Sequence, residues 1–97
     1  MNQPSDADPL VEVYWRPGCP HCRMLLRPLR RSGVKLREIN IREDPEAAAR
    51  VRSVADGNET VPTVFIGDRA MVNPSARQVL AAAGGQPPAR WWSRWRR

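Results

Sequence analysis

Two cysteines, Cys19 and Cys22, are separated by two residues in the segment WRPGCPHC at positions 15–22, and they are the only cysteines among 97 residues. Thiols at this C-x-x-C spacing can close a disulfide, supply half of a zinc site or exchange disulfides with a substrate. The elements on either side of the pair decide which of these is expected.

Two of these alternatives have weak support in the sequence. A zinc site needs two further ligands, and the single histidine, His21, lies between the cysteines on a diverging side chain, so we expect no metal. A purely structural disulfide would close too short a loop to contribute much stability. Residues 1–8 lack the features of a secretory signal, so we expect a cytoplasmic protein, in which such disulfides are rare.

The net charge of +6 is concentrated at the C-terminal end of the chain. Residues 1–89 carry 12 basic and 10 acidic side chains, which leaves a small excess. The other four positive charges are those of Arg90, Arg94, Arg96 and Arg97. The charge therefore gives no reason to expect a specific nucleic-acid partner for the folded part. No apolar run is long enough to cross a bilayer.

The first half of the chain predicts a strand, a helix and a second strand. Residues 10–16 alternate apolar and polar side chains and are ended by Pro17-Gly18. A helix then begins near Pro20 and extends toward Gly33, although Pro28 should kink it or end it early. Its apolar face consists of Cys22, Leu25, Leu26 and Leu29. A strand pattern follows at 34–41.

The second half predicts a helix, a hairpin and a final helix. Asp44-Pro45 starts the first of these helices and Gly57 ends it. Strands are expected at 60–67 and 68–72, and Asn73-Pro74 should then cap a helix that stops at Gly84-Gly85. The expected buried residues of the two helices are Ala47, Ala48, Val51, Val54 and Ala55, and Ala76, Val79, Leu80 and Ala83. The order β-α-β-α-β-β-α predicts an α/β domain at 10–85, between flexible ends at 1–9 and 86–97.

A strand-to-helix turn makes the two sulfurs unequal. Cys19 would lie just before the helix, where free amides and the positive end of the helix dipole favour a thiolate. Cys22 would lie on the apolar face of the helix and be more buried. We therefore expect Cys19 to act as the nucleophile and Cys22 as the resolving thiol.

Residues 10–84 resemble the glutaredoxin family, which has a thioredoxin-like fold. The resemblance rests on VYWRPGCPHC at 13–22, on TVPTVFIG at 60–67, and on a final helix that opens just after a hairpin. It implies a thiol–disulfide oxidoreductase with a four-stranded mixed sheet and helices on both faces. It also implies that Pro62 is cis beside Cys19, so that the backbone at Thr60 and Val61 is exposed to a bound thiol or peptide.

The segment before the final helix is informative about that thiol. Glutaredoxins that bind glutathione usually open this helix with a Gly-Gly-x-Asp-Asp type sequence, which is missing here. Residues 56–80, DGNETVPTVFIGDRAMVNPSARQVL, are instead similar to mycoredoxins, which use mycothiol. The resemblance implies mycothiol rather than glutathione as co-substrate, with electrons from NADPH through a flavin reductase and no tightly bound cofactor. In that scheme either Cys22 or a second mycothiol resolves the adduct on Cys19, and the sequence does not decide between them. Asn73, Pro74 and Ser75 would either contact this thiol or simply cap the helix.

Several basic or rigid residues near the cysteines could tune them. Pro20 stiffens the turn, and Arg16 could stabilise the Cys19 thiolate. His21 is either a second tuning residue or an exposed spacer. A basic face on the same helix could attract acidic proteins or simply be solvated; it consists of Arg23, Arg27, Arg30 and Arg31.

The expected partners are S-thiolated or disulfide-containing proteins, and we expect a monomer. The nearest alternative is an NrdH-type redoxin, which would reduce protein disulfides with electrons from thioredoxin reductase. A different class is a binding module that contacts a membrane or nucleic acid through Trp91, Trp92 and Trp95 of the C-terminal end.

Overall fold

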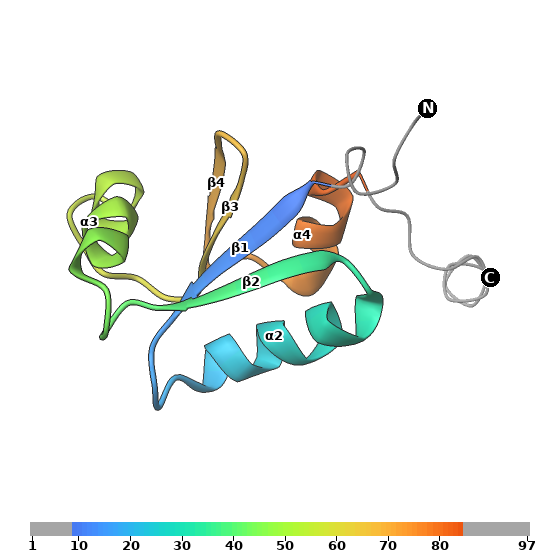
Figure 1. Ribbon diagram of the computed structural model, residues 1–97, viewed down its shortest axis with the longest axis horizontal. Coiled ribbons are helices and arrows are strands. Elements are labelled where there is room, and N and C mark those ends of the chain that lie inside the picture. Colours follow the sequence, from blue (N-terminus) through green and yellow to red (C-terminus); the bar gives the residue numbers. More distant parts are fainter. Residues whose placement is uncertain (1–8, 85–97) are drawn as a thin grey trace.

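A computed structural model describes residues 9–84, and in it a four-stranded sheet has helices on both faces (Figure 1). Its elements are β1 (Leu10–Trp15), α2 (Pro20–Ser32), β2 (Lys35–Asn40), α3 (Pro45–Val54), β3 (Thr63–Ile66), β4 (Arg69–Val72) and α4 (Ala76–Ala82). The predicted order and the α/β fold are confirmed. The ends predicted to be flexible lie outside the described residues, except for Pro9. No helix within 9–84 is long and apolar enough to cross a membrane.

The strands lie in the order β2-β1-β3-β4, with β1 in the interior of the sheet. β1 and β2 are parallel because α2 returns the chain between them, whereas β3 pairs in antiparallel fashion with both β1 and β4. Val13 and Tyr14 of β1 are both buried, on opposite faces of the sheet. The chain leaves this doubly covered strand at Trp15 and turns toward Cys19, so the cysteine turn is held by a rigid element.

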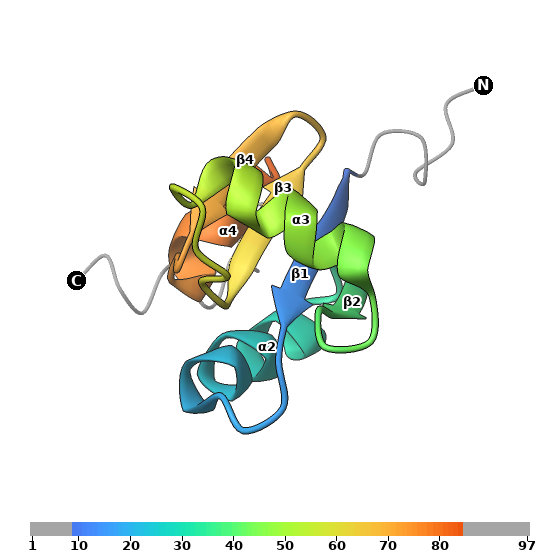
Figure 2. The ribbon, with the colours of Figure 1, turned by 90° about the vertical axis from the view of Figure 1, so that its left-hand side faces the viewer.

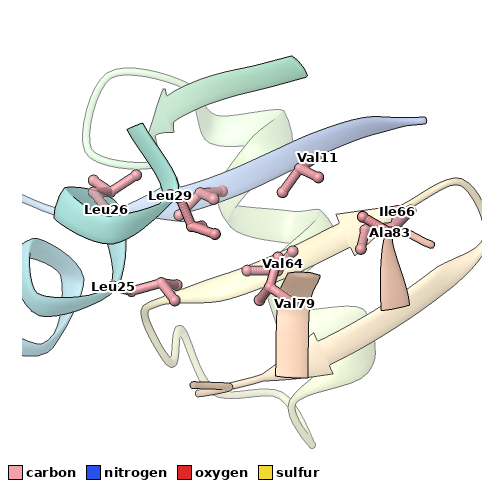
Figure 3. Close-up of a cluster of buried hydrophobic side chains, with 9 residues drawn as sticks. Val11, Leu25, Leu26, Leu29, Val64, Ile66, Val79 and Ala83 are labelled. Carbon is pink, nitrogen blue, oxygen red and sulfur yellow. The ribbon is translucent and has the colours of Figure 1, made fainter. Parts of the chain in front are cut away.

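The larger hydrophobic cluster lies between the sheet and the two helices α2 and α4 (Figure 3). Leu25, Leu26 and Leu29 enter it from α2, and Val79 and Ala83 enter it from α4. These leucines recur at helical spacing with Cys22, which is buried on the same side of α2. Packing of this face therefore also determines where Cys22 lies.

α3 covers the opposite face of the sheet, and in Figure 2 it lies in front of the strands with α4 behind. The rings of Tyr14 and Phe65 meet edge to face beneath it, with centroids 5.2 Å apart. The prediction that Val54 is buried is wrong, since it is 37% exposed. The buried side of α3 and its C-cap residue consists of Ala47, Ala48, Val51 and Ala55. Val54 lies outside this narrow stripe and turns toward solvent.

Pro28 does not end α2, which continues to Ser32. The proline is exposed, and the residue after it, Leu29, is fully buried in the larger cluster. A proline inside a helix removes one backbone donor and crowds the carbonyl of the preceding turn, and burial of the next turn offsets this cost. The helix stops at Gly33, whose φ of 84° lies in the left-handed region that glycine adopts without strain.

The prediction that Asn73 caps the final helix is also wrong. Asn73 has a left-handed φ of 53°, and the cap is Ser75. The Ser75 hydroxyl oxygen accepts a hydrogen bond from the Gln78 N–H at 3.1 Å, and the Ser75 N–H donates to the Gln78 side chain at 2.8 Å. This reciprocal pair outcompetes the Asn-Pro signal, because it satisfies two otherwise free donors.

We expect Ser75→Ala to lower the free energy of unfolding by about 1 kcal/mol, because it removes the hydroxyl oxygen that accepts from the Gln78 N–H and leaves only the backbone half of the capping box. Ser53→Ala is the matched control. Ser53 lies within α3, and its hydroxyl donates to the Arg50 carbonyl of the preceding turn. This change should be neutral or slightly stabilising. Urea unfolding of the two variants measures the difference, and equal stabilities would contradict the assignment of the cap.

Candidate dithiol site

Cys19 is the N-cap residue of α2. Its sulfur accepts a hydrogen bond from the Cys22 N–H at 3.2 Å, and its carbonyl oxygen accepts one from the Arg23 N–H at 3.3 Å. The sharp turn that delivers it passes through Gly18, whose φ is 80°. A sulfur at this place faces a backbone donor and the positive end of a helix dipole, and both stabilise negative charge on it.

Cys22 lies one helical turn further on and is only 2% exposed. Burial raises the pKa of its thiol to about 12, and a hydrogen bond with Cys19 acts in the same direction. A hydrogen bond with the Arg16 backbone opposes this shift. Both cysteines are free thiols, and Cys19 is the more exposed of the two. The two sulfurs are therefore unequal in burial and in hydrogen bonding.

This inequality predicts selective alkylation of the reduced protein. At pH 8 a thiol with a pKa of about 12 is ionised to roughly one part in 10⁴, so iodoacetamide should modify Cys19 and spare Cys22. Labelling of Cys22 should increase as the pH rises toward that pKa. Peptide mass mapping gives the result, and a sample labelled in denaturant shows that Cys22 can react. Equal labelling of both cysteines in the native protein at pH 8 would contradict the described burial.

A loop from a distant part of the chain reaches the Cys19 sulfur. The Cys19 thiol donates to the carbonyl oxygen of Val61 at 3.9 Å, and the following peptide bond, Val61–Pro62, is cis. The Pro62 carbonyl oxygen then accepts a hydrogen bond from the Asn73 N–H at 2.8 Å. These two contacts connect three segments: the turn before α2, the loop before β3 and the segment before α4.

Thr63 is a residue of this site that the sequence analysis does not single out. It is fully buried, and its hydroxyl donates to the Thr60 carbonyl oxygen at 2.7 Å, which fixes the loop on the N-terminal side of Pro62. An ion pair between Arg52 and Glu59 connects the same loop to α3. The sequence feature that could have indicated Thr63 is its polar side chain at the start of an otherwise apolar strand, TVFI.

The remaining predicted site residues lie either between the loop before β3 and the start of α4, or around the start of α2. Thr60 is half-buried and Pro74 is buried, whereas Ser75 is exposed at the helix start. Pro20 is the first residue of α2, and Arg16 lies beside Cys22 through its backbone. His21 is exposed and has no hydrogen bond or ion pair within residues 9–84. Both interpretations of His21, as a tuning residue and as a spacer, stay predictions.

The arrangement suits thiol–disulfide exchange. A partly exposed sulfur stabilised by an N–H can attack an incoming disulfide, and a second thiol one turn away can displace the product. The carbonyl of Val61 is positioned to contact whatever is joined to Cys19. Among the described residues, no group of three or more histidine, cysteine or acidic side chains could hold a metal ion.

Comparisons with known proteins support this chemistry. The family model described as Glutaredoxin matches residues 11–72. Mycoredoxin 1 of Corynebacterium glutamicum is 42% identical over 72 residues, which span 73% of this chain and 89% of that protein. The structure of the NrdH-redoxin of Escherichia coli superimposes with a TM-score of 0.63 at 25% identity, covering 74% and 92% of the two chains. The glutaredoxin of Archaeoglobus fulgidus has a TM-score of 0.62 at 28% identity and covers 84% and 92%.

Proposed function

The chain belongs to the glutaredoxin family of thiol–disulfide oxidoreductases, and on that premise we propose that it reduces mixed disulfides between proteins and mycothiol. The observation that carries this proposal is the Cys19 sulfur, which lies at the start of α2 within reach of both the Cys22 N–H and the Val61 carbonyl. The 42% identity to Mycoredoxin 1, spanning most of both chains, supports mycothiol as the co-substrate.

In the first step the Cys19 thiolate attacks the mycothiol sulfur of the mixed disulfide. A Cys19–mycothiol disulfide forms, the bond between protein and mycothiol breaks, and the target protein leaves as a thiolate that takes up a proton. The hydrogen bond from the Cys22 N–H stabilises the attacking sulfur. The Val61 carbonyl and its neighbours Thr60 and Pro62 would then contact the backbone-like amides of the bound thiol.

The adduct on Cys19 can be resolved by either of two thiols. A second mycothiol thiolate can attack the mycothiol sulfur, which regenerates the Cys19 thiolate and forms mycothiol disulfide. Alternatively Cys22 attacks Cys19, which forms an internal disulfide and releases mycothiol. Burial raises the pKa of Cys22, so its thiolate is scarce and the first route is favoured. A flavin reductase would return the electrons from NADPH.

A second candidate function is that of a redoxin that reduces protein disulfides directly. The likeness to the E. coli NrdH-redoxin, which is described as having a thioredoxin-like activity profile, favours this alternative. The Gly-Gly-x-Asp-Asp type sequence that grips glutathione is missing here, which is compatible with either function. The two candidates differ in the source of electrons.

Reduction of one mycothiolated protein with three electron sources separates them. We expect the rate with mycothiol and its reductase to exceed the rates with glutathione or with thioredoxin reductase by at least about tenfold, if the site is selective for mycothiol by a little over 1 kcal/mol. Efficient recycling by thioredoxin reductase alone would instead establish the redoxin.

The remaining expectations stay predictions. These are a cytoplasmic location, a monomeric state and partners that are S-thiolated or disulfide-containing proteins. The binding module based on Trp91, Trp92 and Trp95 falls on residues 86–97, outside the described part of the chain. Deletion of residues 86–97 with full retention of activity would separate that segment from the chemistry at Cys19.

A further inference from the structure

α2 carries arginine as its only charged residue type, apart from the possible charge of His21. α4 likewise has no carboxylate, so both helices over the larger hydrophobic cluster have no acidic side chain. The carboxylates of the described residues all lie on β1, on β2, on α3 or in the turns. This layer of the molecule is consequently positive.

Three of the four arginines of α2 are not neutralised within residues 9–84. Arg30 is the exception, since it forms a bidentate ion pair with Glu38. Its Nη2 lies 2.6 Å from Oε1 and its Nε lies 2.8 Å from Oε2. Arg23, Arg27 and Arg31 are exposed and make no ion pair with the described residues. The arginines on β2 and α3 behave differently, because Arg37, Arg50 and Arg52 each contact a glutamate.

These three arginines follow one another at intervals of four residues, and the first of them lies one helical turn after Cys19. At a rise of 1.5 Å per residue they lie about 6, 12 and 18 Å along the helix axis from Cys19. Alternate residues of an extended peptide are separated by a similar distance, roughly 6.7 Å. Met24, which is 71% exposed, borders the same stripe and offers an apolar contact.

We propose that Arg23, Arg27 and Arg31, named here the arginine row, dock an extended acidic segment next to the disulfide of the protein substrate. The proposal rests on the function proposed above and adds the class of partner. A protein is favoured over a nucleic acid because the row begins one helical turn after Cys19, the residue proposed to attack the disulfide of a protein substrate. Exposed charges of this kind steer association more than they hold a complex together, so the effect should decrease as salt is added.

The test uses the full chain and three synthetic decapeptides that each carry one cysteine in a mixed disulfide with mycothiol. Their alternate flanking residues are Glu, Gln or Lys. We expect kcat/KM to be about fivefold higher for the Glu peptide than for the Gln peptide at low salt, and lowest for the Lys peptide. The difference between the Glu and Gln peptides should largely vanish near 0.5 M salt, at which the screening length is about 4 Å.

Arg27→Glu tests the row itself, and Arg69→Glu is the matched control. Arg69 is exposed and makes no ion pair within residues 9–84. It opens β4 opposite Ile66, which pairs with Val11 near the beginning of β1, whereas Cys19 follows the end of β1. Both variants change the net charge equally. Arg27→Glu should abolish the preference for the Glu peptide, Arg69→Glu should keep it, and both should reduce the Gln peptide at the original rate.

The outcomes separate this inference from the function on which it rests. If none of the three peptides is reduced, the proposed function itself is wrong. Equal kcat/KM for the Glu and Gln peptides, with full activity on both, would overturn the arginine row alone, as would an equal loss of preference in Arg69→Glu. Inhibition by a single-stranded RNA at concentrations at which a Glu peptide without a disulfide has no effect would also overturn it. That result would assign the row to nucleic acid.

Discussion

Cys19→Ser should lower the rate of reduction of a mycothiolated protein by about a thousandfold or more, because a serine hydroxyl cannot replace the attacking thiolate. At this position the substitution should remove the thiol without disturbing the start of the helix. Cys19 is the N-cap of α2, and serine is a preferred N-cap residue whose oxygen can accept the same hydrogen bond from the Cys22 N–H. The variant should therefore keep the fold and lose the chemistry.

Thermal unfolding is the control for this variant. An unchanged melting temperature together with lost activity assigns the effect to the sulfur alone. Activity above a tenth of the original rate in Cys19→Ser would show that another group attacks the disulfide. Ser32→Ala offers a further comparison at the other end of α2, where the hydroxyl donates to the Leu29 carbonyl and should not affect the reaction.

Cys22→Ser should have an effect that depends on the substrate. Reduction of a mycothiolated protein should decrease only severalfold, because a second mycothiol can resolve the adduct on Cys19. Reduction of an internal disulfide of a protein should decrease by about a hundredfold or more, since there the covalent complex with Cys19 has no nearby thiol to displace it. The same variant therefore measures how far each route depends on the buried thiol.

Initial rates with the two substrates, measured on the same protein sample, provide the comparison. The buried position of residue 22 requires a stability control, because a serine hydroxyl there needs the hydrogen bond that the Arg16 backbone now makes with the thiol. Equal losses on both substrates, in a variant with normal unfolding, would contradict the route through a second mycothiol.

The order of elements could be predicted because hydrophobic patterns and local signals agree along most of the chain. Val11 and Val13 alternate along a strand, and Leu25, Leu26 and Leu29 recur at helical spacing, and both sets are buried in the larger cluster. The cap at Asp44 is also found as predicted, with its carboxylate accepting from two backbone N–H groups. These features depend on neighbours within a few residues.

The errors arise where local signals compete or where tertiary packing decides. The Asn73-Pro74 pattern predicts a cap at Asn73, whereas the reciprocal bonds between Ser75 and Gln78 place it two residues later. Pro28 favours an early end or a kink of α2, but the helix continues because Leu29 is buried in the core. Val54 fits the apolar spacing of α3 but lies outside the narrow buried stripe, which contains only four residues.

The composition of the dithiol site could be predicted only in part. The inequality of Cys19 and Cys22 follows from a strand-to-helix turn, and the structure shows it directly. The contact between Cys19 and Val61 joins residues 42 positions apart, and no local pattern encodes it. It was expected from the resemblance to a family, whereas the support from Thr63 was not foreseen at all. The roles of these residues in catalysis stay predictions.

The most direct test of the account is to trap the first covalent intermediate. Cys22→Ser is mixed with a protein that carries mycothiol on a single cysteine, the reaction is quenched with acid, and intact masses are measured. The account predicts that one mycothiol is transferred to Cys19 while the substrate is released in its reduced form. A disulfide between Cys19 and the substrate protein, or no adduct on Cys19 despite reduction of the substrate, would contradict it.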